Sequence, residues 1–243
     1  MRLDRFICKH TEYSHQQARR LVACGRVQVD GQPVREGRTE VTPFMQILLD
    51  DRLLQQRTAR YLMLHKPAGY LSATTDPQHP TVLELLPPEL HPELHLAGRL
   101  DRTTTGLLLL TNDGQWSRRL TAPEQKIPKV YLVTTAEPIR ACAERRFAAG
   151  IPLAREGVTT SPARIERLGP CEARLTIHEG RHHQVKRMFA AIGNRVIALH
   201  REAVGLIQLD QQLPPGGWRP LTPEERELDL WPDLDAGPCL AYS

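Results

Sequence analysis

Residues 95–110 constrain the fold of this chain more than any other segment. An apolar stretch runs into the tetrapeptide Gly-Arg-Leu-Asp at 98–101, three threonines follow, and four consecutive leucines close the segment. This order predicts a strand, a polar turn and a second, very apolar strand. Asp101 is then expected where the chain leaves the sheet, with the cations Arg99 and Arg102 beside it.

Asp101 has two interpretations from its neighbours in the sequence. A carboxylate between two cations is expected to stay ionised at neutral pH and to be available as a nucleophile or a base. An aspartate in a turn, however, often accepts hydrogen bonds from its own backbone and has no further role. Sequence spacing alone favours the turn aspartate, so the catalytic interpretation needs support from elsewhere in the chain.

The chain beyond residue 58 alternates strand and helix patterns without a regular βαβ period. A first apolar strand starts at Tyr61. Further strands are expected at 94–98, 107–111, 129–135, 163–168, 173–178 and 196–204, and helices at 81–86, 114–121, 139–149, 182–192 and 222–229. We therefore expect an α+β domain over residues 59–230, with flanking helices on a mostly antiparallel mixed sheet.

Residues 1–50 predict a separate module of two helices and a hairpin. Ser14 and Gln17 form a capping box at the start of the second helix, and the pair Asp30-Gly31 predicts a tight hairpin turn. Between residues 2 and 26 there are six bases and only two acids, so the polar faces of both helices are cationic. The polar residues that follow, 51–60, are expected to be a linker, which gives an N-terminal domain with its linker at 1–58.

The charge distribution favours a polyanionic partner. The net charge is +4, but the segment from residue 222 onward contributes −5, which leaves +9 on residues 1–221. Such a surplus favours nucleic acid through counterion release, although ordinary surface charge explains it equally well. The end of the chain, residues 231–243, is expected to be a flexible acidic tail.

Metal binding, secretion and membrane insertion are not expected. The five cysteines are an odd number without metal-ligand spacing, and His182 and His183 are adjacent instead of one helical turn apart. The longest leucine run, 107–110, is too short to span a bilayer, and the first residues lack an apolar leader. A reduced, cytoplasmic protein is the expectation.

The N-terminal module resembles the S4 RNA-binding domain. The matching residues are Ser-His-Gln-Gln-Ala-Arg-Arg-Leu-Val at 14–22, Gly-Arg-Val at 25–27 and Val-Asp-Gly at 29–31. The resemblance implies that the cationic helix pair binds RNA. Its candidate contacts are Arg2, Arg5, Ser14, Arg19, Arg20 and Arg26.

Four motifs in the second domain resemble the pseudouridine synthases related to the enzyme that modifies small-subunit ribosomal RNA. The segment 98–107 matches the family signature Gly-Arg-Leu-Asp followed by Thr-x-Gly-Leu, whose aspartate is catalytic. The others, in the family's order, are a Lys-Pro-x-Gly loop at 66–69, a Lys-x-Tyr strand at 129–131 and a helix at 179–189 containing His-Gln-Val-Lys. Thr103 departs from the pattern, because many members carry an acidic or amide side chain there, so the support of the Asp101 loop is expected to differ.

The resemblance implies a role for each candidate site residue. Asp101 is the catalytic carboxylate, Tyr131 contacts the target base, and Lys186 pairs with Asp101. Since the target nucleotide must be flipped out of the RNA, Arg99 is expected to enter the space that it vacates. Further RNA contacts are expected at Lys66, Arg181 and Arg187.

Two of these residues have plainer interpretations. Tyr131 fits equally a half-buried aromatic side chain of a strand. Lys186 fits a solvated charge on an amphipathic helix, because it lies beside the expected buried face formed by Val185, Met188 and Phe189.

The implied reaction isomerises uridine to pseudouridine in RNA. Asp101 promotes cleavage of the N1–C1′ bond, the detached uracil rotates, and C5 joins C1′, with no cofactor or metal. Whether Asp101 attacks C1′, adds to the base or removes the C2′ proton stays open.

The nearest likeness is to the enzyme acting on uridine-516 of 16S rRNA. It rests on residues 79–83, on residues 114–117 and on the short acidic end of the chain. We expect a monomer whose partner is 16S rRNA, free or within a small-subunit assembly intermediate. The alternatives are a pseudouridine synthase for 23S rRNA and a non-catalytic RNA-binding assembly factor.

Overall fold

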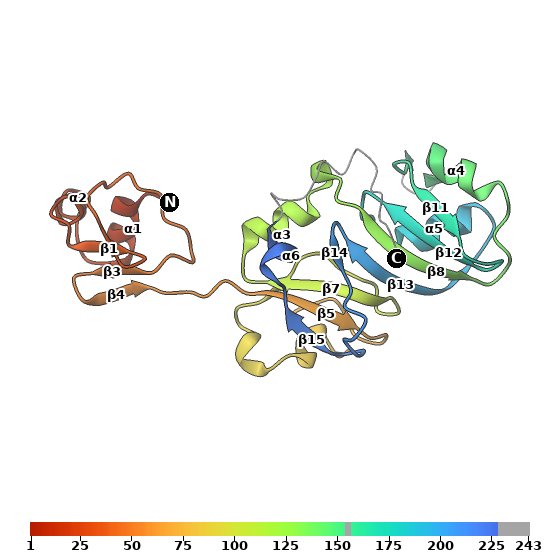
Figure 1. Ribbon diagram of the computed structural model, residues 1–243, viewed down its shortest axis with the longest axis horizontal. Coiled ribbons are helices and arrows are strands. Elements are labelled where there is room, and N and C mark those ends of the chain that lie inside the picture. Colours follow the sequence, from red (N-terminus) through yellow and green to blue (C-terminus); the bar gives the residue numbers. More distant parts are fainter. Residues whose placement is uncertain (154–156, 228–243) are drawn as a thin grey trace. The chain divides into compact units, whose positions relative to one another are not determined.

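A computed structural model describes residues 1–153 and 157–227 of the chain. The chain divides into two compact units, Met1–Ala59 and Arg60–Ser243, which Figure 1 shows in red to orange and in orange to blue. No helix within the described ranges combines the length and the apolar composition that a bilayer span requires. The tail expected at 231–243 lies outside the described residues.

The first unit packs two helices on a small antiparallel sheet with the strand order β2-β1-β3-β4. Its elements are α1 (Leu3–His10), α2 (His15–Ala23), β1 (Val27–Val29), β2 (Gln32–Val34), β3 (Ile47–Leu49) and β4 (Arg52–Gln55). The linker expected at 51–60 is wrong in its first half, because β4 pairs with β3 there. This strand lies at the edge of the sheet and exposes Arg52 and Leu53, so its sequence lacks the alternation of a half-buried strand.

Local signals in the first unit form as predicted. The Ser14 hydroxyl accepts a hydrogen bond from the backbone N–H of Gln17, and the Gln17 side chain accepts one from the backbone N–H of Ser14. Asp30 and Gly31 both have positive φ, 50° and 77°, as a type I′ hairpin turn requires. The apolar faces of the two helices meet the sheet in one core, which includes Leu3, Phe6, Ile7, Ala18, Leu21, Val22, Val27 and Ile47.

The second unit is built on a nine-stranded sheet with the main order β11-β12-β8-β13-β7-β5-β15. Its strands are β5 (Tyr61–Lys66), β6 (His95–Leu96), β7 (Thr105–Thr111), β8 (Lys129–Thr135), β11 (Arg164–Arg167), β12 (Glu172–Ile177), β13 (Val196–Val204), β14 (Ile207–Gln208) and β15 (Trp218–Pro220). Of the described pairings in this sheet, only β13 with β7 is parallel. The expected α+β fold with a mostly antiparallel mixed sheet is confirmed.

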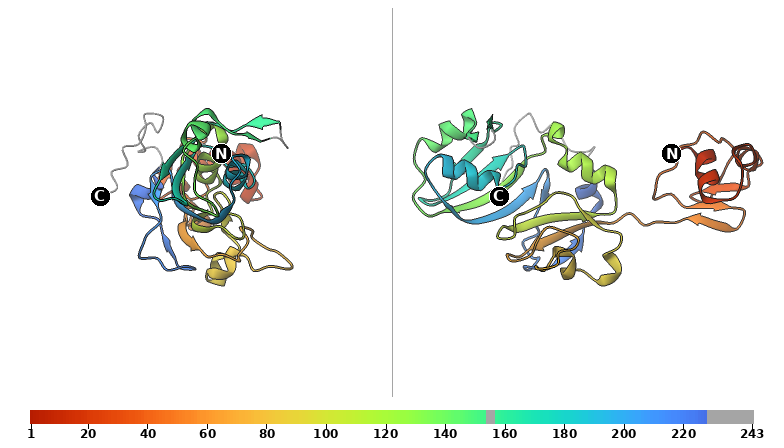
Figure 2. Two further views of the ribbon diagram at one scale, coloured as in Figure 1. Left: turned by 90° about the vertical axis from the view of Figure 1, so that its right-hand side faces the viewer. Right: turned by 180° about the vertical axis from the view of Figure 1, so that it is seen from behind.

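The four leucines at 107–110 are consecutive because both faces of β7 are covered. Leu108 and Leu110 belong to a core shared with the helices α4 and α5 and the 3-10 turn η1, whereas Leu107 and Leu109 pack with α3. Figures 1 and 2 show α4 and α5 beside β11 and β12, and the yellow segment of η1 and η2 beneath β5 and β15. The helical elements are α3 (Gly114–Thr121), α4 (Ala143–Ala149), α5 (Gln184–Ala191), α6 (Pro223–Arg226), η1 (Val82–Leu85), η2 (Pro88–Leu90) and η3 (Pro123–Gln125).

Differences from the expected elements have local causes. The six strands expected beyond residue 90 lie within two residues of their observed bounds. The helix expected at 139–149 begins only at Ala143, because the backbone N–H of Ile139 donates to the carbonyl of Pro170 instead of entering a helix. The helix expected at 81–86 is a 3-10 turn. Three short pairings in this unit were not predicted: β15 with β5, β14 with β13, and β9 (Pro152–Leu153) with β10 (Val158–Thr159).

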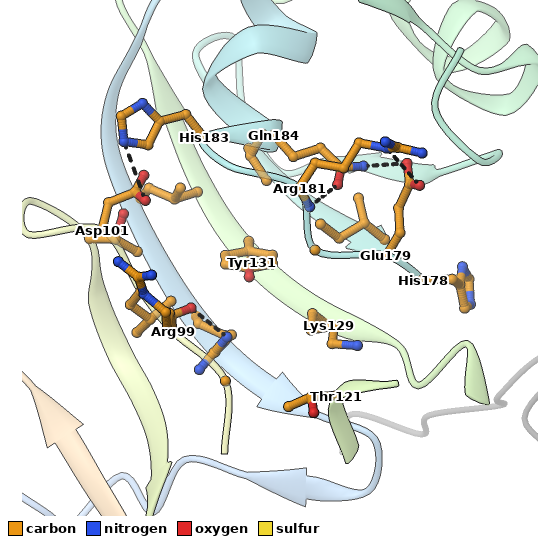
Figure 3. A pocket seen from close by; sticks show the side chains of 18 of the residues that line it. Arg99, Asp101, Thr121, Lys129, Tyr131, His178, Glu179, Arg181, His183 and Gln184 are labelled. Carbon is orange, nitrogen blue, oxygen red and sulfur yellow. Dashed lines mark hydrogen bonds and ion pairs between the residues drawn. The ribbon is translucent and has the colours of Figure 1, made fainter. Parts of the chain in front are cut away.

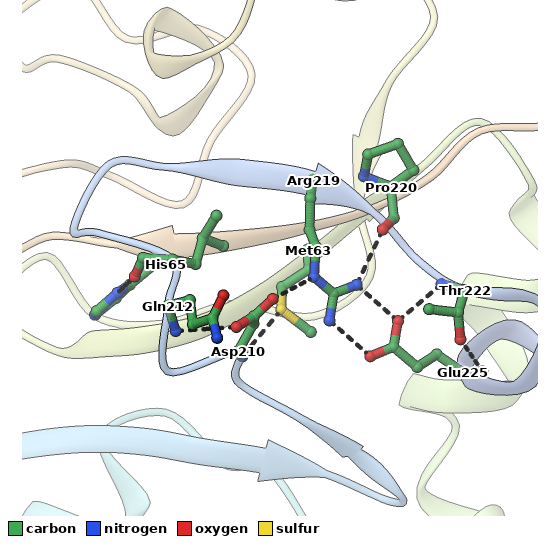
Figure 4. Close-up of polar contacts among 9 residues, drawn as sticks. Met63, His65, Asp210, Gln212, Arg219, Pro220, Thr222 and Glu225 are labelled. Carbon is green, nitrogen blue, oxygen red and sulfur yellow. Dashed lines mark hydrogen bonds and ion pairs between the residues drawn. The ribbon is translucent and has the colours of Figure 1, made fainter.

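The side chain of Arg219, in β15, links the last described residues to the sheet through hydrogen bonds. Its guanidinium donates to the carboxylates of Asp210 at 2.8 Å and Glu225 at 2.8 and 2.9 Å, as Figure 4 shows. Trp116 adds an indole hydrogen bond of 2.8 Å to the carbonyl of Arg226. The helix expected at 222–229 is thus seen as the single turn α6, and its last two expected residues lie outside the described range.

Candidate active site

A cavity of about 450 Å³ opens on the second unit beside the loop that contains Asp101. One wall is this loop, residues 98–104, and the opposite wall is the segment from the end of β12 into α5. Strands β8 and β13 form the floor with Tyr131 and Arg201. Figure 3 shows Asp101 at one end of the cavity and Lys129 at the other, with Tyr131 between them.

The Asp101 carboxylate faces two cationic or protonatable groups from the wall opposite. Oδ2 lies 3.4 Å from Nζ of Lys186, and Oδ1 lies 3.5 Å from Nε2 of His183. The Lys186 ammonium also donates to the hydroxyl of Thr103 at 2.9 Å. The ion pair expected between Lys186 and Asp101 is therefore present, and Thr103 shares its cation.

The cations expected to flank Asp101 do not form its ion pairs. Arg99 and Arg102 are both exposed, and in the described part of the chain the ion pairs of Asp101 are with Lys186 and His183. The direct contacts of the carboxylate thus come from the α5 segment and not from its neighbours in sequence. Arg99 still lines the cavity, on the side of Asp101.

His183 was not assigned a role from the sequence. It precedes the first residue of α5 in the left-handed conformation, with φ 51°, and its ring stacks on that of His182 at a centroid distance of 3.8 Å. This unusual backbone places its Nε2 at Asp101. The signal in the sequence that points to His183 is its place in the His-Gln-Val-Lys motif.

Lys66 serves the Asp101 loop instead of RNA. Its side chain is fully buried, and Nζ donates to the carbonyls of Pro67 at 2.9 Å, Arg102 at 3.2 Å and Thr104 at 2.9 Å. Burial lowers the pKa of this ammonium to about 8, against the opposing effect of Asp101. The prediction that Lys66 binds RNA is wrong, because an ammonium enclosed by three carbonyls has no face left for a phosphate.

Further hydrogen bonds fix the loop on the other side of Asp101 from those of Lys66. The hydroxyl of Ser72 donates to the carbonyl of Leu100 at 2.7 Å and accepts from its N–H at 3.0 Å. Gly69 donates its N–H to the carbonyl of Arg102 at 2.8 Å. Together with Lys66, these bonds fix the backbone on both sides of the carboxylate, which explains why a Lys-Pro-x-Gly loop accompanies the aspartate motif.

Gly106 brings β7 against β13. A Cβ at this position would lie 2.3 Å from the carbonyl oxygen of Arg201, and its φ is 104°. Only glycine tolerates both conditions. The glycine of the Thr-x-Gly motif therefore allows the parallel pairing of β7 with β13, which brings the Arg201 strand beside the Asp101 loop.

The cavity floor carries three polar or aromatic side chains on one face of the sheet. Tyr131 is buried, at 8% exposure, and is the register partner of Arg201. Lys129 lies two residues before Tyr131, hence on the same face, and lines the same cavity. Its pKa is lowered to about 8 by burial and by the charge of Arg201. Neither Lys129 nor Arg201 was predicted as a site residue. Lys129 belongs to the Lys-x-Tyr motif, whereas Arg201 lies in the expected strand 196–204, outside the four motifs.

The segment from the end of β12 into α5 forms the wall opposite the Asp101 loop. Val185, Met188 and Phe189 are buried as expected, and Lys186 lies at the edge of that face. Arg181 lines the cavity but its Nε is 3.2 Å from the Glu179 carboxylate. Arg187 does not line the cavity and donates to the carbonyl of His182 at 3.0 Å.

The six expected RNA contacts of the first unit differ in their surroundings. The buried carboxylate of Asp4 binds the side chains of both Arg2 and Arg19, and Asp50 pairs with Arg26 at 2.8 and 2.6 Å. Arg5 and Arg20 are exposed, and no ion pair of theirs is found among the described residues. Ser14 is exposed, with its hydroxyl in the capping box.

Comparison with known proteins assigns both units. The profile of the S4 domain matches residues 1–47, and that of the RNA pseudouridylate synthase family matches residues 60–191. The chain is 57% identical over 226 residues to the ribosomal small subunit pseudouridine synthase A of Pseudomonas aeruginosa, covering 93% of this chain and 98% of that protein. The protein of the same name from Escherichia coli K12 is 49% identical over 226 residues, with the same coverage.

A solved structure agrees with these sequence matches. A crystal structure of a pseudouridylate synthase superposes with a TM-score of 0.69 at 42% identity, over 93% of this chain and 98% of the other. The resemblance inferred from the four motifs and the N-terminal module is confirmed. The chain belongs to the RNA pseudouridylate synthase family and carries an S4 domain in front of its synthase domain.

Proposed function

We propose that the protein isomerises one uridine of small-subunit ribosomal RNA to pseudouridine at the cavity beside Asp101. The observation that carries the proposal is the position of the Asp101 carboxylate at one end of the cavity, 3.4 Å from the Lys186 ammonium. Hydrogen bonds from Lys66 and with Ser72 fix the backbone on both sides of it. The names of the relatives from Pseudomonas aeruginosa and Escherichia coli, which specify the ribosomal small subunit, support this substrate over 23S rRNA.

Asp101 acts here as the catalytic carboxylate on a flipped-out nucleotide. Lys186 and His183 contact the two carboxylate oxygens at 3.4 and 3.5 Å and orient the carboxylate beside the cavity. Tyr131 offers its ring to the extruded uracil from the floor of the cavity, and Arg99 lies on the Asp101 side, where it can occupy the space that the nucleotide leaves. Flipping removes a few kcal/mol of stacking, which such contacts offset in part.

Uridine-516 of 16S rRNA is the proposed target, and the protein acts on it as a monomer in the cytoplasm. The S4 domain contributes sequence-independent affinity through its exposed cations. A non-catalytic assembly factor that only binds RNA would have no use for a buried lysine holding the loop of a carboxylate. The hydrogen bonds that fix the Asp101 loop therefore favour the enzyme over that alternative.

The decisive variant is Asp101→Asn, which removes the carboxylate charge and keeps the shape. We expect no detectable pseudouridine in 16S rRNA, an unchanged melting temperature and RNA affinity within about twofold of the wild type. The matched control is Asp51→Asn, an exposed aspartate of the first unit. Turnover by Asp101→Asn at the wild-type rate would exclude the catalytic assignment.

The target is tested in a strain that lacks the gene. Mapping of pseudouridine in both large rRNAs should show loss at position 516 of 16S rRNA alone. Loss at a 23S position instead would transfer the function to the large subunit. Assays of the purified protein on naked 16S rRNA and on a small-subunit assembly intermediate would then identify the form of the substrate.

A further inference from the structure

Arg201 is a buried cation with one unused pair of hydrogen-bond donors. Its side chain lies on the cavity floor and the residue is 4% exposed. Nε donates to the carbonyl of Leu107 at 2.8 Å and Nη1 to that of Arg99 at 3.4 Å. Nη2 is buried and has no acceptor among the described residues. Buried polar atoms in folded proteins are nearly always paired, and an arginine cannot escape by losing its charge.

A second unpaired polar atom belongs to another residue of the same cavity. The hydroxyl of Thr104 is buried without a hydrogen-bond partner among the described residues, and Thr104 lines the cavity with Arg201. Tyr131 lies directly across from Arg201 in the pairing of β8 with β13. Two unused polar groups and an aromatic ring thus belong to one cavity, which is the combination expected for a flat ligand with polar edges.

We propose that Arg201 binds a carbonyl oxygen of the target uracil through Nη2 while the base lies against Tyr131. The inference rests on the proposed function and adds the group that recognises the base. Uracil has two carbonyl oxygens and one N–H in its plane, so it can use Nη2 and the Thr104 hydroxyl together. A phosphate fits this place less well, because Ile177, Val185 and Leu199 make the adjoining walls apolar.

The same contact strengthens during the reaction. When the N1–C1′ bond breaks, its electron pair stays on N1 of the uracil. The resulting negative charge spreads onto the two carbonyl oxygens of the base. A fixed guanidinium donates a stronger hydrogen bond to such an oxygen than to that of the neutral base. Lys129, whose pKa is lowered to about 8 by burial and by Arg201, lies on the same face and adds to the positive potential.

If the carbonyl oxygen that Arg201 binds is O4 of the uracil, the contact also predicts discrimination against cytidine. Cytosine carries an amino group in place of that oxygen, so two donors would oppose each other and Nη2 would stay unpaired. A buried donor without an acceptor disfavours binding strongly. Recognition of uracil would then come from Arg201, separately from the chemistry at Asp101.

The test compares the wild type with Arg201→Gln on a short RNA that contains the target site. Single-turnover rates are measured with uridine, 2-thiouridine or 4-thiouridine at the target, because sulfur accepts hydrogen bonds poorly. We expect the wild type to slow about tenfold on one of the two thio substrates, and Arg201→Gln to be about 100-fold slower than the wild type on uridine with no further loss on that thio substrate. RNA affinity should change by less than about twofold.

Controls separate the possible failures. Arg145→Gln, which removes an exposed charge of α4 outside the cavity, should leave all three rates unchanged. If Arg201→Gln does not fold, Arg201→Lys keeps the buried charge without the planar fork, and its thio effect should be smaller than that of the wild type. Equal thio effects in the wild type and in a folded variant would overturn the inference. Absence of product from the wild type on uridine would instead count against the proposed function.

Discussion

The ammonium of Lys186 lies 3.4 Å from the carboxylate of Asp101 and joins two segments that are far apart in the chain. Asp101 belongs to the loop before β7, whereas Lys186 lies in the first turn of α5. The pair is about one-quarter to one-third exposed, so water screens it less than a surface pair. The cation therefore orients the carboxylate and places a positive charge beside it.

Replacing Lys186 by methionine should slow isomerisation by about 100-fold with little change in RNA affinity, because the lost interaction acts on the reacting carboxylate. Lys186→Arg should retain more activity, since it keeps the positive charge. Single-turnover rates and filter-binding affinities on the same RNA measure the two effects. An equal rate for Lys186→Met and the wild type would show that the pair is only structural.

Thr103→Val is the matched control for this variant. It removes the hydroxyl that accepts from Lys186 at 2.9 Å and leaves the ion pair with Asp101. One hydrogen bond contributes about 0.5–1.5 kcal/mol, so a loss of about two- to tenfold is expected. Greater loss than with Lys186→Met would mean that Thr103, the departure from the family pattern, takes part in the chemistry itself.

Gly106→Ala should destabilise the synthase domain severely. The new Cβ would lie 2.3 Å from a backbone oxygen of Arg201, which cannot move without breaking the pairing of β7 with β13. We expect a loss of more than about 3 kcal/mol or no folded protein. Gly114→Ala is the control, since nothing lies within 4 Å of the added Cβ and alanine favours the first turn of α3. Thermal unfolding of both variants measures the difference, and similar melting temperatures would contradict the assignment of Gly106.

The sequence was most informative where a local pattern decides the structure. The Ser14–Gln17 capping box, the Asp30-Gly31 turn and the apolar run 107–110 each specify an element without help from the rest of the chain. The edge strand β4 escaped prediction because its exposed, polar residues resemble a linker. The short strand β15 was not predicted because it forms by pairing with β5, which lies far away in sequence.

The site was predictable in outline and not in its contacts. Family motifs identified Asp101 and Tyr131, which line one cavity, and Lys186, which contacts Asp101. The surroundings of Asp101 depend on long-range packing, so the sequence did not indicate that His183 lies beside its carboxylate. Burial reversed the expectation for Lys66 and revealed Arg201, because the same basic residue can bind phosphate at the surface or hold carbonyls in the interior.

The free energy of unfolding of the first unit should depend on pH through the carboxylate of Asp4. Burial raises its pKa, but the hydrogen bonds from Arg2 and Arg19 outweigh this effect, so the pKa is lowered below that of an unfolded aspartate. The stabilisation is then fully present above about pH 4, the unfolded value, and is lost as the pH falls through the lower folded value. Hydrogen exchange of residues 1–59, corrected for the intrinsic rate at each pH, should show protection decreasing below pH 4.

Asp4→Asn supplies the comparison. At pH 7 the first unit of this variant should be less stable by about 1.5–3 kcal/mol, because charged hydrogen bonds are removed. The difference from the wild type should shrink as the pH falls below about 4 and through the lowered folded pKa of Asp4. Asp51→Asn, at an exposed position, should match the wild type at every pH. A constant difference between Asp4→Asn and the wild type would show that the Asp4 charge is not the source of the pH dependence.

Arg5 and Arg20 should carry the salt-dependent part of RNA binding by the S4 domain. Both are exposed and lack ion pairs among the described residues, whereas Arg2, Arg19 and Arg26 already bind carboxylates. An arginine that must first leave a carboxylate gains less from a phosphate. The double variant Arg5→Gln with Arg20→Gln should weaken binding and lower the slope of log affinity against log salt by about 1.4–1.8, as for two phosphate contacts. Arg52→Gln, an exposed position on the edge strand β4, should leave the slope unchanged, and an equal effect of both variants would indicate that only net charge matters.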